Sequence, residues 1–343
     1  MEYRLMGNTG VSVSRLCLGT MTFGKETDEA GAHEQLDMFV EAGGNFIDTA
    51  DVYNGGESER IIGRWLAKQD GRADELVIAT KGRFPTFDHP NGVGLSRKHL
   101  TQALDASLRR LGVDHVDLYQ VHAFDPLTPL DETLRFFDDA VSAGKIGYFG
   151  LSNFIGWQIA ALSELAAATD RVAPVMLQPQ YNLLTRYIEL EIIPACLEYG
   201  IGLIPWSPLG GGWLTGKYQR DNVPAGASRL GEDPKRGMEN YEERNADDRV
   251  WRILDEVKSV ADEAGLTMAQ VALTWVADRP AVTSPILGNR TTGQLAEALK
   301  IADVHLDDAQ AERLDQVSAP VLPDYPYGRR GGEQRSRKVS GGR

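Results

Sequence analysis

The sequence predicts an α/β fold, a (β/α)8 TIM barrel, and three observations carry this prediction. Eight strand-like segments alternate with helix-like ones along the chain. No low-complexity linker interrupts residues 1–320, so we expect them to form a single domain. Three of the strand-like segments end in polar side chains, which is how a barrel presents reactive groups at the carboxyl ends of its strands. The length of 343 residues is compatible with one barrel of this class.

The predicted strands are short apolar runs bounded by residues that favour turns. They cover residues 16–18, 45–48, 77–80, 116–120, 148–151, 175–178, 202–205 and 284–287. Helical patterns fill the intervals, at residues 28–42, 58–68, 97–111, 130–143, 157–168, 187–199, 249–264 and 292–301. Within 97–111, Leu100, Leu104, Leu108 and Leu111 form an apolar stripe at helical spacing, which we expect to pack against the barrel.

Four segments depart from this alternation. The helical patterns at 268–277 and 307–317 are predicted to be extra helices near the C-terminus, outside the barrel. Residues 219–249 follow the seventh strand and are rich in Gly, Pro and charge, so we predict a lid over the active face, the alternative being a solvated insertion. Residues 321–343 end in a basic run rich in Gly and Ser, which predicts a flexible tail.

The composition narrows the class of partner and the compartment. A net charge of -13 repels phosphate, so neither nucleic acid nor a membrane is expected as a partner. No apolar run approaches the roughly 18 residues that span a bilayer, and the first residues lack a signal-peptide core, which together predict a cytoplasmic protein. Cys17 and Cys196 lie far apart and are expected to be buried, without a disulfide or metal role. A monomer and a homo-oligomer both remain open.

Asp48, Tyr53, Lys81 and His122 follow successive predicted strands and can therefore converge on one rim. Reduction of a carbonyl needs a proton donor at the oxygen, and a tyrosine with a pKa of about 10 gives up its proton reluctantly. A nearby Lys81 would lower that pKa, Asp48 would hold Lys81 charged, and His122 would orient the substrate oxygen. Each residue alone is more often structural, but together they predict a catalytic group with Tyr53 as the general acid.

These residues also carry a resemblance. Residues 43–50 with Tyr53, Glu57 and Gly63, then Lys81 and the segment 119–122, resemble the aldo-keto reductase superfamily, in its bacterial branch with extended loops that is related to the potassium-channel β-subunit-like reductases. The resemblance implies an N-terminal β-hairpin before the barrel, consistent with a turn at residues 8–10. It also implies NADPH-dependent (NADP+ in reverse) reduction of an aldehyde or ketone, with the four residues above as the catalytic tetrad.

The same resemblance implies a set of cofactor-binding residues. Ser152, Asn153 and Gln178 match residues that meet the nicotinamide carboxamide, with Trp206 stacked on the ring. Gly-rich turns let backbone amides approach a pyrophosphate, with Lys217 as a countercharge. Arg290 would hold the 2′-phosphate as a planar fork, while Ala298 departs from the family's usual Asn. The complete implied set is Gly19, Thr20, Met21, Asp48, Ser152, Asn153, Gln178, Trp206, Ser207, Pro208, Leu209, Gly211, Lys217, Gly288, Asn289, Arg290, Gln294 and Glu297.

The substrate is less well defined by the sequence. Aromatic and polar side chains could line an amphipathic pocket for a sugar-like or cyclic hydroxylated carbonyl compound, the expected small-molecule partner. The candidates are Phe23, Phe84, His89 and Trp213.

Two other functions deserve comparison with a reductase. A metal-dependent barrel hydrolase is not expected, because the six histidines show no His-x-His spacing and no metal site is predicted. A redox-sensing module that binds NADP(H) with slow turnover, like the channel β-subunits, is the alternative that an intact tetrad permits.

Overall fold

The computed structural model describes residues 1–69, 71–226, 228–235 and 237–328. Its centre is an eight-stranded parallel sheet in the order β10-β3-β4-β5-β6-β7-β8-β9. The strands are β3 (Cys17–Gly19), β4 (Phe46–Asp48), β5 (Val77–Gly82), β6 (Val116–Val121), β7 (Ile146–Ser152), β8 (Met176–Gln178), β9 (Gly202–Leu203) and β10 (Ile286–Gly288). A parallel bridge between Leu203 and Val282 links β9 to the segment that enters β10, so the sheet curls into a barrel.

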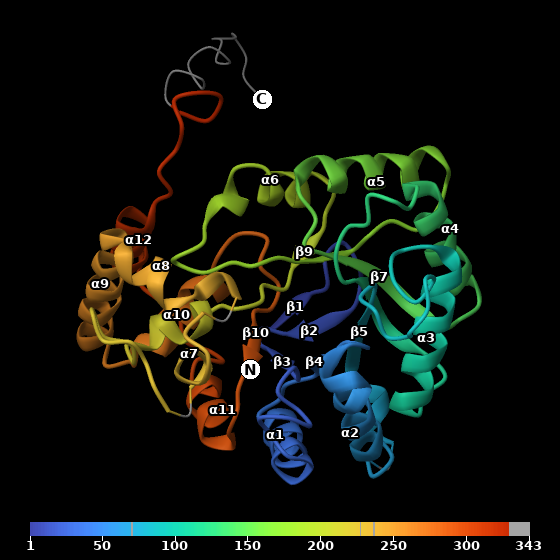
Figure 1. The fold of residues 1–343 in the computed structure, drawn as a ribbon, viewed down its shortest axis with the longest axis horizontal. Coiled ribbons are helices and arrows are strands. Elements are labelled where there is room, and N and C mark those ends of the chain that lie inside the picture. The colour runs from blue at the N-terminus through green and yellow to red at the C-terminus, as the bar shows by residue number, and fades with distance from the viewer. Residues whose placement is uncertain (70, 227, 236, 329–343) are drawn as a thin grey trace.

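Helices cover the outside of this sheet (Figure 1), as the alternating pattern predicted. They are α1 (Glu29–Glu41), α2 (Glu57–Leu66), α3 (Arg97–Leu111), α4 (Leu130–Ser142), α5 (Gly156–Ala168), α6 (Ile192–Glu198), α7 (Arg229–Glu232), α8 (Tyr241–Ala246), α9 (Asp248–Ala264), α10 (Met268–Ala277), α11 (Thr292–Leu299) and α12 (Asp308–Ser318). Short 3-10 turns are η1 (Tyr53–Gly56), η2 (Arg72–Glu75), η3 (Tyr187–Glu189), η4 (Gly210–Thr215) and η5 (Gly237–Glu239). The (β/α)8 class is therefore confirmed, with α9, α10 and α12 gathered on one side.

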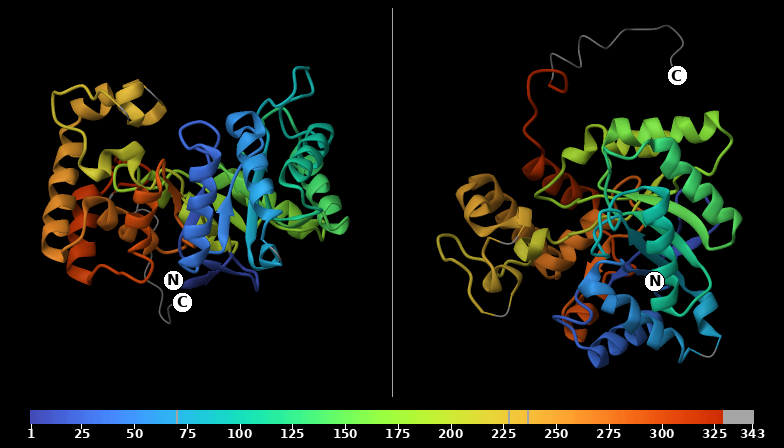
Figure 2. Two further views of the ribbon diagram at one scale, coloured as in Figure 1. Left: turned by 90° about the horizontal axis from the view of Figure 1, so that it is seen from below. Right: turned by 45° about the vertical axis from the view of Figure 1, so that its right-hand side comes forward.

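An antiparallel hairpin of β1 (Tyr3–Leu5) and β2 (Ser12–Ser14) precedes the barrel, as predicted. Its apolar residues Met6 and Val13 join the interior cluster of the barrel, so the hairpin closes one end. Gly7 lies at φ +56°, and a Cβ there would meet the Val175 carbonyl oxygen at 2.1 Å. Only glycine lets the hairpin approach this closely. In the left panel of Figure 2, the hairpin lies at the lower end and the yellow segment after β9 at the upper end.

Successive residues of each strand alternate between the barrel interior and the helices. Val77 and Ala79 of β5 belong to the interior cluster. Ile78 between them packs in the outer cluster instead. Extending this alternation by one step turns the side chain of Lys81 toward the interior. The same rule turns Asp48, which follows interior Phe46 by two residues, toward the same space.

Two predicted segments differ in detail. The expected helix at 187–199 is divided into η3 and α6, with the α-helix beginning only at Ile192. Pro194 explains the late start, because proline has no N–H to donate and is tolerated only in the first turn of a helix. The stretch 219–249, predicted as irregular, contains α7, η5 and α8. Of the predicted flexible tail at 321–343, residues 329–343 lie outside the described part of the chain.

Candidate active site

The interior of the barrel ends in a layer of polar side chains at the carboxyl ends of its strands. Asp48 ends β4, Lys81 is the last residue but one of β5, Gln120 holds the same place in β6, and Gln178 ends β8. All four side chains are buried. Strand alternation places these four side chains on the inner face of the barrel, next to the apolar interior cluster and nearer the carboxyl ends of the strands. They therefore meet across the barrel.

Asp48 is the centre of the resulting hydrogen-bond network. Its Oδ2 accepts from Lys81 Nζ at 2.5 Å, while its Oδ1 accepts from Gln120 Nε2 at 3.0 Å and from Gln178 Nε2 at 2.9 Å. Lys81 Nζ also donates to the Thr49 carbonyl at 2.8 Å. A buried charge persists only when it is paired and hydrogen-bonded, and both conditions are met here.

Tyr53 completes the group from the loop after β4. Its hydroxyl lies 3.2 Å from Lys81 Nζ, and its ring lies 5.9 Å from the His122 ring in an edge-on arrangement. The loop is fixed behind it by Asn54, at φ +50°, whose Nδ2 donates to the carbonyls of Phe23 and Met21 at 2.6 and 3.1 Å. All four predicted catalytic residues are therefore adjacent.

Burial and the charge of Lys81 set the protonation states of this group. Burial raises the pKa of Tyr53, and Lys81 lowers it, as expected, but the effect of burial is the larger, so the pKa of Tyr53 lies above its usual value. Burial lowers the pKa of Lys81, but Asp48 and Tyr53 together raise it above its usual value. Burial, then Lys81 and Arg83, lower the pKa of His122 well below its usual value. At neutral pH the site holds a phenol, an ammonium and an uncharged imidazole.

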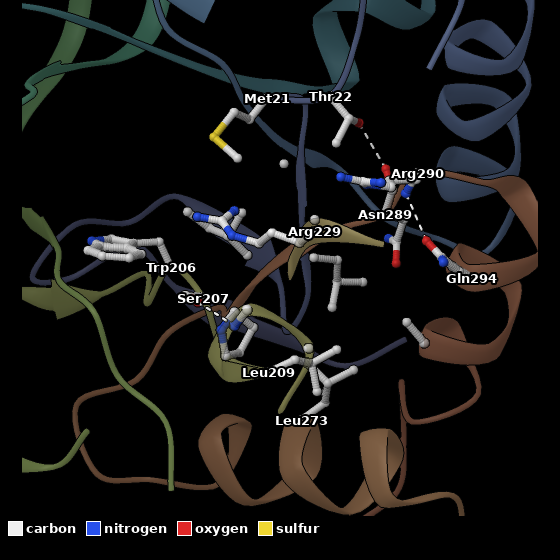
Figure 3. A pocket seen from close by; sticks show the side chains of 18 of the residues that line it. Met21, Thr22, Trp206, Ser207, Leu209, Arg229, Leu273, Asn289, Arg290 and Gln294 are labelled. Carbon is white, nitrogen blue, oxygen red and sulfur yellow. Dashed lines mark hydrogen bonds between the residues drawn. The ribbon is translucent and has the colours of Figure 1, made fainter. Parts of the chain in front are cut away.

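A cavity of about 860 Å³ opens beside these residues, and Figure 3 shows part of its wall. Tyr53 and His122 line it at one end, and it extends along β9 and β10 to α11. Every cofactor-binding residue implied by the sequence resemblance lines this cavity. They are Gly19, Thr20, Met21, Asp48, Ser152, Asn153, Gln178, Trp206, Ser207, Pro208, Leu209, Gly211, Lys217, Gly288, Asn289, Arg290, Gln294 and Glu297.

At the end near Tyr53, Asn153 connects the segments that follow β6, β7 and β9. Its backbone has φ +56°, a conformation that asparagine tolerates better than most residues. Its Nδ2 donates to the His122 carbonyl at 3.0 Å, and its Oδ1 accepts from Trp206 Nε1 at 3.1 Å. The Oγ of the preceding residue, Ser152, donates to the Gln178 carbonyl at 2.9 Å. The orientation of the Trp206 indole is thereby tied to the segment that carries His122.

The middle of the cavity is bordered by the turn after β9. Gly211 and Gly212 lie at φ +65° and +96°, and a Cβ on Gly212 would meet Lys217 Nζ at 2.5 Å. Ser207 Oγ donates to buried Glu239 at 2.5 Å, which anchors the segment after η4 to this turn. Burial lowers the pKa of Lys217, and the charges of Arg290 and Arg229 lower it further. Lys217, Arg229 and Arg290 thus place three positive charges along the middle and far end of the cavity.

The far end is bordered by Arg290, in the loop after β10. Its Nη1 and Nη2 lie 2.6 and 3.1 Å from the two carboxylate oxygens of Glu232, and Nη2 lies 3.6 Å from Glu26. Its backbone N–H donates to Gln294 Oε1 at 2.9 Å, as Figure 3 shows. The predicted lid segment supplies Glu232, so it contacts the residue implied for phosphate binding.

A model of the Aldo/keto reductase family matches residues 15–319. The chain belongs to the aldo/keto reductase family. It is 37% identical over 325 residues to "Uncharacterized oxidoreductase YrpG" of Bacillus subtilis, covering 92% of this chain and 96% of that protein. It is also 37% identical to "Probable voltage-gated potassium channel subunit beta" of Oryza sativa subsp. japonica, over 94% of this chain and 97% of that one. "Versiconal hemiacetal acetate reductase" of Aspergillus parasiticus is 34% identical to this chain, over 93% of this chain and 98% of that protein.

Membership of the aldo/keto reductase family makes this chain an oxidoreductase of general carbonyl chemistry. The family generally uses a nicotinamide cofactor. No helix within the described residues is long and apolar enough to cross a membrane. No group of His, Cys, Asp and Glu in that part of the chain could hold a metal ion.

The predicted substrate residues are not brought together in this aldo/keto reductase. Phe84 lies beside the site, with its ring 4.7 Å from the His122 ring. Trp213 is fully buried, stacks on Tyr241 and donates from Nε1 to the Glu239 carbonyl, so it does not line the cavity. Phe23 is also fully buried, and exposed His89 stacks on Phe87 outside the cavity. These side chains lie in loops that follow strands, where the sequence does not indicate whether a ring faces the cavity or the core.

Sequence reasoning missed several residues of the site. Gln120 was recognisable from strand alternation. It follows interior Leu118 by two residues in β6, so its side chain faces inward, where it donates to Asp48. Arg229 extends from α7 into the cavity (Figure 3), and no local signal in a charged loop distinguished it. The other residues of the wall outside the implied set are Thr22, Glu26, Gly212, Thr215, Ser228, Thr267, Ala269, Gln270, Leu273, Ile286, Leu287, Thr291, Gly293 and Ala298.

Proposed function

We propose that this protein is an NADPH-dependent reductase that converts an aldehyde or ketone to the alcohol. The observation that carries the proposal is the position of the Tyr53 hydroxyl, 3.2 Å from a buried ammonium and at the end of a long cavity. A phenol in that place can donate a proton to a carbonyl oxygen, and the reverse reaction would return it. The substrate would be a small molecule, and we propose that the reaction takes place in the cytoplasm.

In this proposal, each residue of the tetrad has one task. Tyr53 donates its proton to the substrate oxygen, and the ammonium of Lys81 stabilises the phenolate that remains. Asp48 holds Lys81 charged and in place through the 2.5 Å contact. His122, uncharged because burial and two cations lower its pKa, serves as a hydrogen-bond donor that orients the carbonyl. A nicotinamide cofactor, when bound, supplies the hydride.

The cavity supports a nicotinamide dinucleotide in three respects. Its volume of about 860 Å³ lies in the upper range of small-molecule and cofactor sites. The end near Tyr53 offers the amide and hydroxyl of Asn153 and Ser152 for a carboxamide. Lys217, Arg229 and Arg290 offer positive charge farther along, where phosphates would lie. NADPH is proposed over NADH because Arg290 provides a guanidinium fork for a 2′-phosphate.

The test is steady-state oxidation of NADPH, and in parallel of NADH, with a panel of aldehydes and ketones. We expect turnover of at least one carbonyl class by the wild-type protein and at least about a hundredfold slower turnover by Tyr53→Phe. The panel includes sugar-like and cyclic hydroxylated ketones beside simple aldehydes, because removing ring hydroxyls from a good substrate would show whether they contribute to its recognition. Absence of turnover across the panel with both cofactors would contradict the proposal.

A second candidate function is a nucleotide-sensing module that binds NADP(H) and turns over slowly. It is favoured by one specific observation, the 37% identity to proteins named "Probable voltage-gated potassium channel subunit beta" from Oryza sativa subsp. japonica and Arabidopsis thaliana. The two functions differ in their rates. Rapid turnover on one class of carbonyl compound would exclude the sensor, whereas tight NADPH binding without appreciable turnover would favour it.

A further inference from the structure

Arg83 is a cation beside the catalytic group that the proposed mechanism does not use. It follows Lys81 by two residues, at the start of the loop between β5 and α3. The side chain is half-buried. Its guanidinium lies 5.0 Å from the centre of the Phe84 ring, and that ring lies 4.7 Å from the His122 ring. Phe84 therefore contacts both Arg83 and His122.

The guanidinium of Arg83 is incompletely satisfied within the protein. Its Nε is buried and has no hydrogen-bond partner in the described structure. Nη2 makes one long contact of 3.5 Å with the Phe124 carbonyl oxygen. By contrast, Arg110 pairs with Glu59 at 2.6 Å and Arg186 pairs with Glu189 at 2.7 Å. An anion stabilises an arginine that is partly removed from water, and the ion pairs of the described residues give Arg83 no such partner.

The carboxylate that lies in the same region, Asp125, is already engaged. Its Oδ2 accepts from the Leu95 N–H at 2.9 Å and from Thr128 Oγ1 at 2.6 Å. Its Oδ1 accepts from the Leu127 N–H at 3.0 Å. Across the described residues, no carboxylate comes within ion-pair distance, 4.0 Å, of Arg83. Asp125 thus accepts its hydrogen bonds within its own part of the chain and makes no ion pair with Arg83.

The charge of Arg83 acts on His122, which in the proposed mechanism binds the substrate carbonyl. Together with burial and Lys81, it lowers the pKa of His122. A substrate whose carbonyl oxygen lies between Tyr53 and His122 would extend past Phe84 toward Arg83. The ring of Phe84 would support an apolar or planar linker between the two ends.

We propose that Arg83 binds a carboxylate of the substrate, so that the preferred substrates are aldehydes or ketones that carry a carboxylate a short distance from the carbonyl. The inference rests on the proposed function and adds the substrate class. A planar guanidinium binds a carboxylate through two parallel hydrogen bonds, which fixes direction as well as position. Anchoring the far end would hold the carbonyl against Tyr53, which is how remote binding energy assists a reaction.

The experiment compares 4-formylbenzoate with its methyl ester, two aldehydes that differ in charge at one end. Values of kcat/KM are measured with NADPH for the wild-type protein, and we expect the carboxylate to be preferred about tenfold or more. Arg83→Gln should reduce the ratio of the two kcat/KM values about ten- to a hundredfold. Arg83→Lys should restore part of it. Arg135→Gln, which removes an equally charged but exposed side chain from α4, should leave the ratio unchanged.

The outcomes separate this inference from the proposed function. Equal reduction of both aldehydes, with a ratio insensitive to Arg83, would overturn the inference and leave carbonyl reduction intact. An equal loss on both substrates in Arg83→Gln would show that Arg83 acts through the pKa of His122 and would also overturn it. If neither aldehyde is reduced, the proposed function fails for these compounds, and calorimetric titration of 4-(hydroxymethyl)benzoate and its methyl ester decides the inference. Selective binding of the acid, lost in Arg83→Gln, would support it, and equal binding would refute it.

Discussion

Glu232 on α7 holds both terminal nitrogens of Arg290, at 2.6 and 3.1 Å, across 58 residues of sequence. Glu26 adds a second carboxylate at 3.6 Å from Nη2 of the same guanidinium. A 2′-phosphate that binds Arg290 would therefore exchange one anion for another and would also act on the segment that carries Glu232. If Arg290 holds that phosphate, as proposed, cofactor affinity and the position of α7 would be coupled through one side chain.

Arg290→Ala should weaken NADPH binding about ten- to a hundredfold, because it removes charge-assisted hydrogen bonds to the 2′-phosphate. NADH, which has no such phosphate, should lose little affinity. Fluorescence titration of both cofactors provides the measurement. Equal losses for the two cofactors would show that the 2′-phosphate binds elsewhere.

Glu232→Gln tests whether Glu232 competes with the 2′-phosphate for Arg290. Removing the carboxylate should strengthen NADPH binding, since Arg290 would no longer exchange its ion pair for the phosphate, and the effect on NADH should be smaller. The same titrations measure it. Weaker binding of NADPH in this variant would indicate that Glu232 assists the cofactor instead of competing with it.

Tyr53→Phe should lower kcat by at least about a hundredfold, because proton transfer from a positioned side chain contributes that much or more. The dissociation constant of NADPH should change little, since the hydroxyl donates a proton and is not assigned to cofactor binding. Single-turnover kinetics and NADPH titration measure the two quantities separately. Retained turnover would refute the assignment of Tyr53 as the acid.

Lys81→Met should destabilise the fold by about 3 to 5 kcal/mol, the typical cost of leaving one partner of a buried ion pair uncompensated. Asp48 would keep its hydrogen bonds from Gln120 and Gln178 but would lose the ammonium at 2.5 Å. The double variant Lys81→Met, Asp48→Asn should be more stable than Lys81→Met alone. Urea unfolding of the two single variants and the double variant completes the cycle, and strictly additive effects would contradict direct coupling.

The stability of the protein should depend on the protonation of Asp51. Burial, and then the nearby Glu59, raise the pKa of the Asp51 carboxyl to about 8. In the unfolded chain that pKa is about 3.9. Between these values the folded state binds the extra proton, so this group makes the protein less stable as the pH rises from about 4 to about 8.

Asp51→Asn should therefore gain stability relative to the wild type as the pH rises from 5 to 7.5, by about 1 kcal/mol or more. Urea unfolding of both proteins at the two pH values measures the difference. A constant difference between variant and wild type would show that Asp51 is ionised over this whole range. The comparison between two proteins cancels the titration of the other groups.

Much of the fold and the catalytic corner could be predicted because both depend on short-range pattern. The alternation along β4 and β5 dictates that Asp48 and Lys81 face inward, and parallel strands bring them to the same end. The direction of Trp213 could not be read in this way, because stacking on Tyr241, 28 residues later, turns it into the core. The pairing of Glu232 with Arg290 is equally invisible to local pattern, since it depends on how α7 folds back over the barrel.

Asp48 has a consequence for how the protein reaches its native state. Its two oxygens connect side chains from β5, β6 and β8 to β4 itself. Strands β4 and β5 alone would pair the two charges, but Oδ1 of Asp48 would lack its two amide donors until β6 and β8 are in place, so a partly assembled barrel would hold an incompletely hydrogen-bonded ion pair in its interior. The chemistry of the site thus penalises incomplete intermediates, and the return of a competent catalytic centre should coincide with the last cooperative step of refolding.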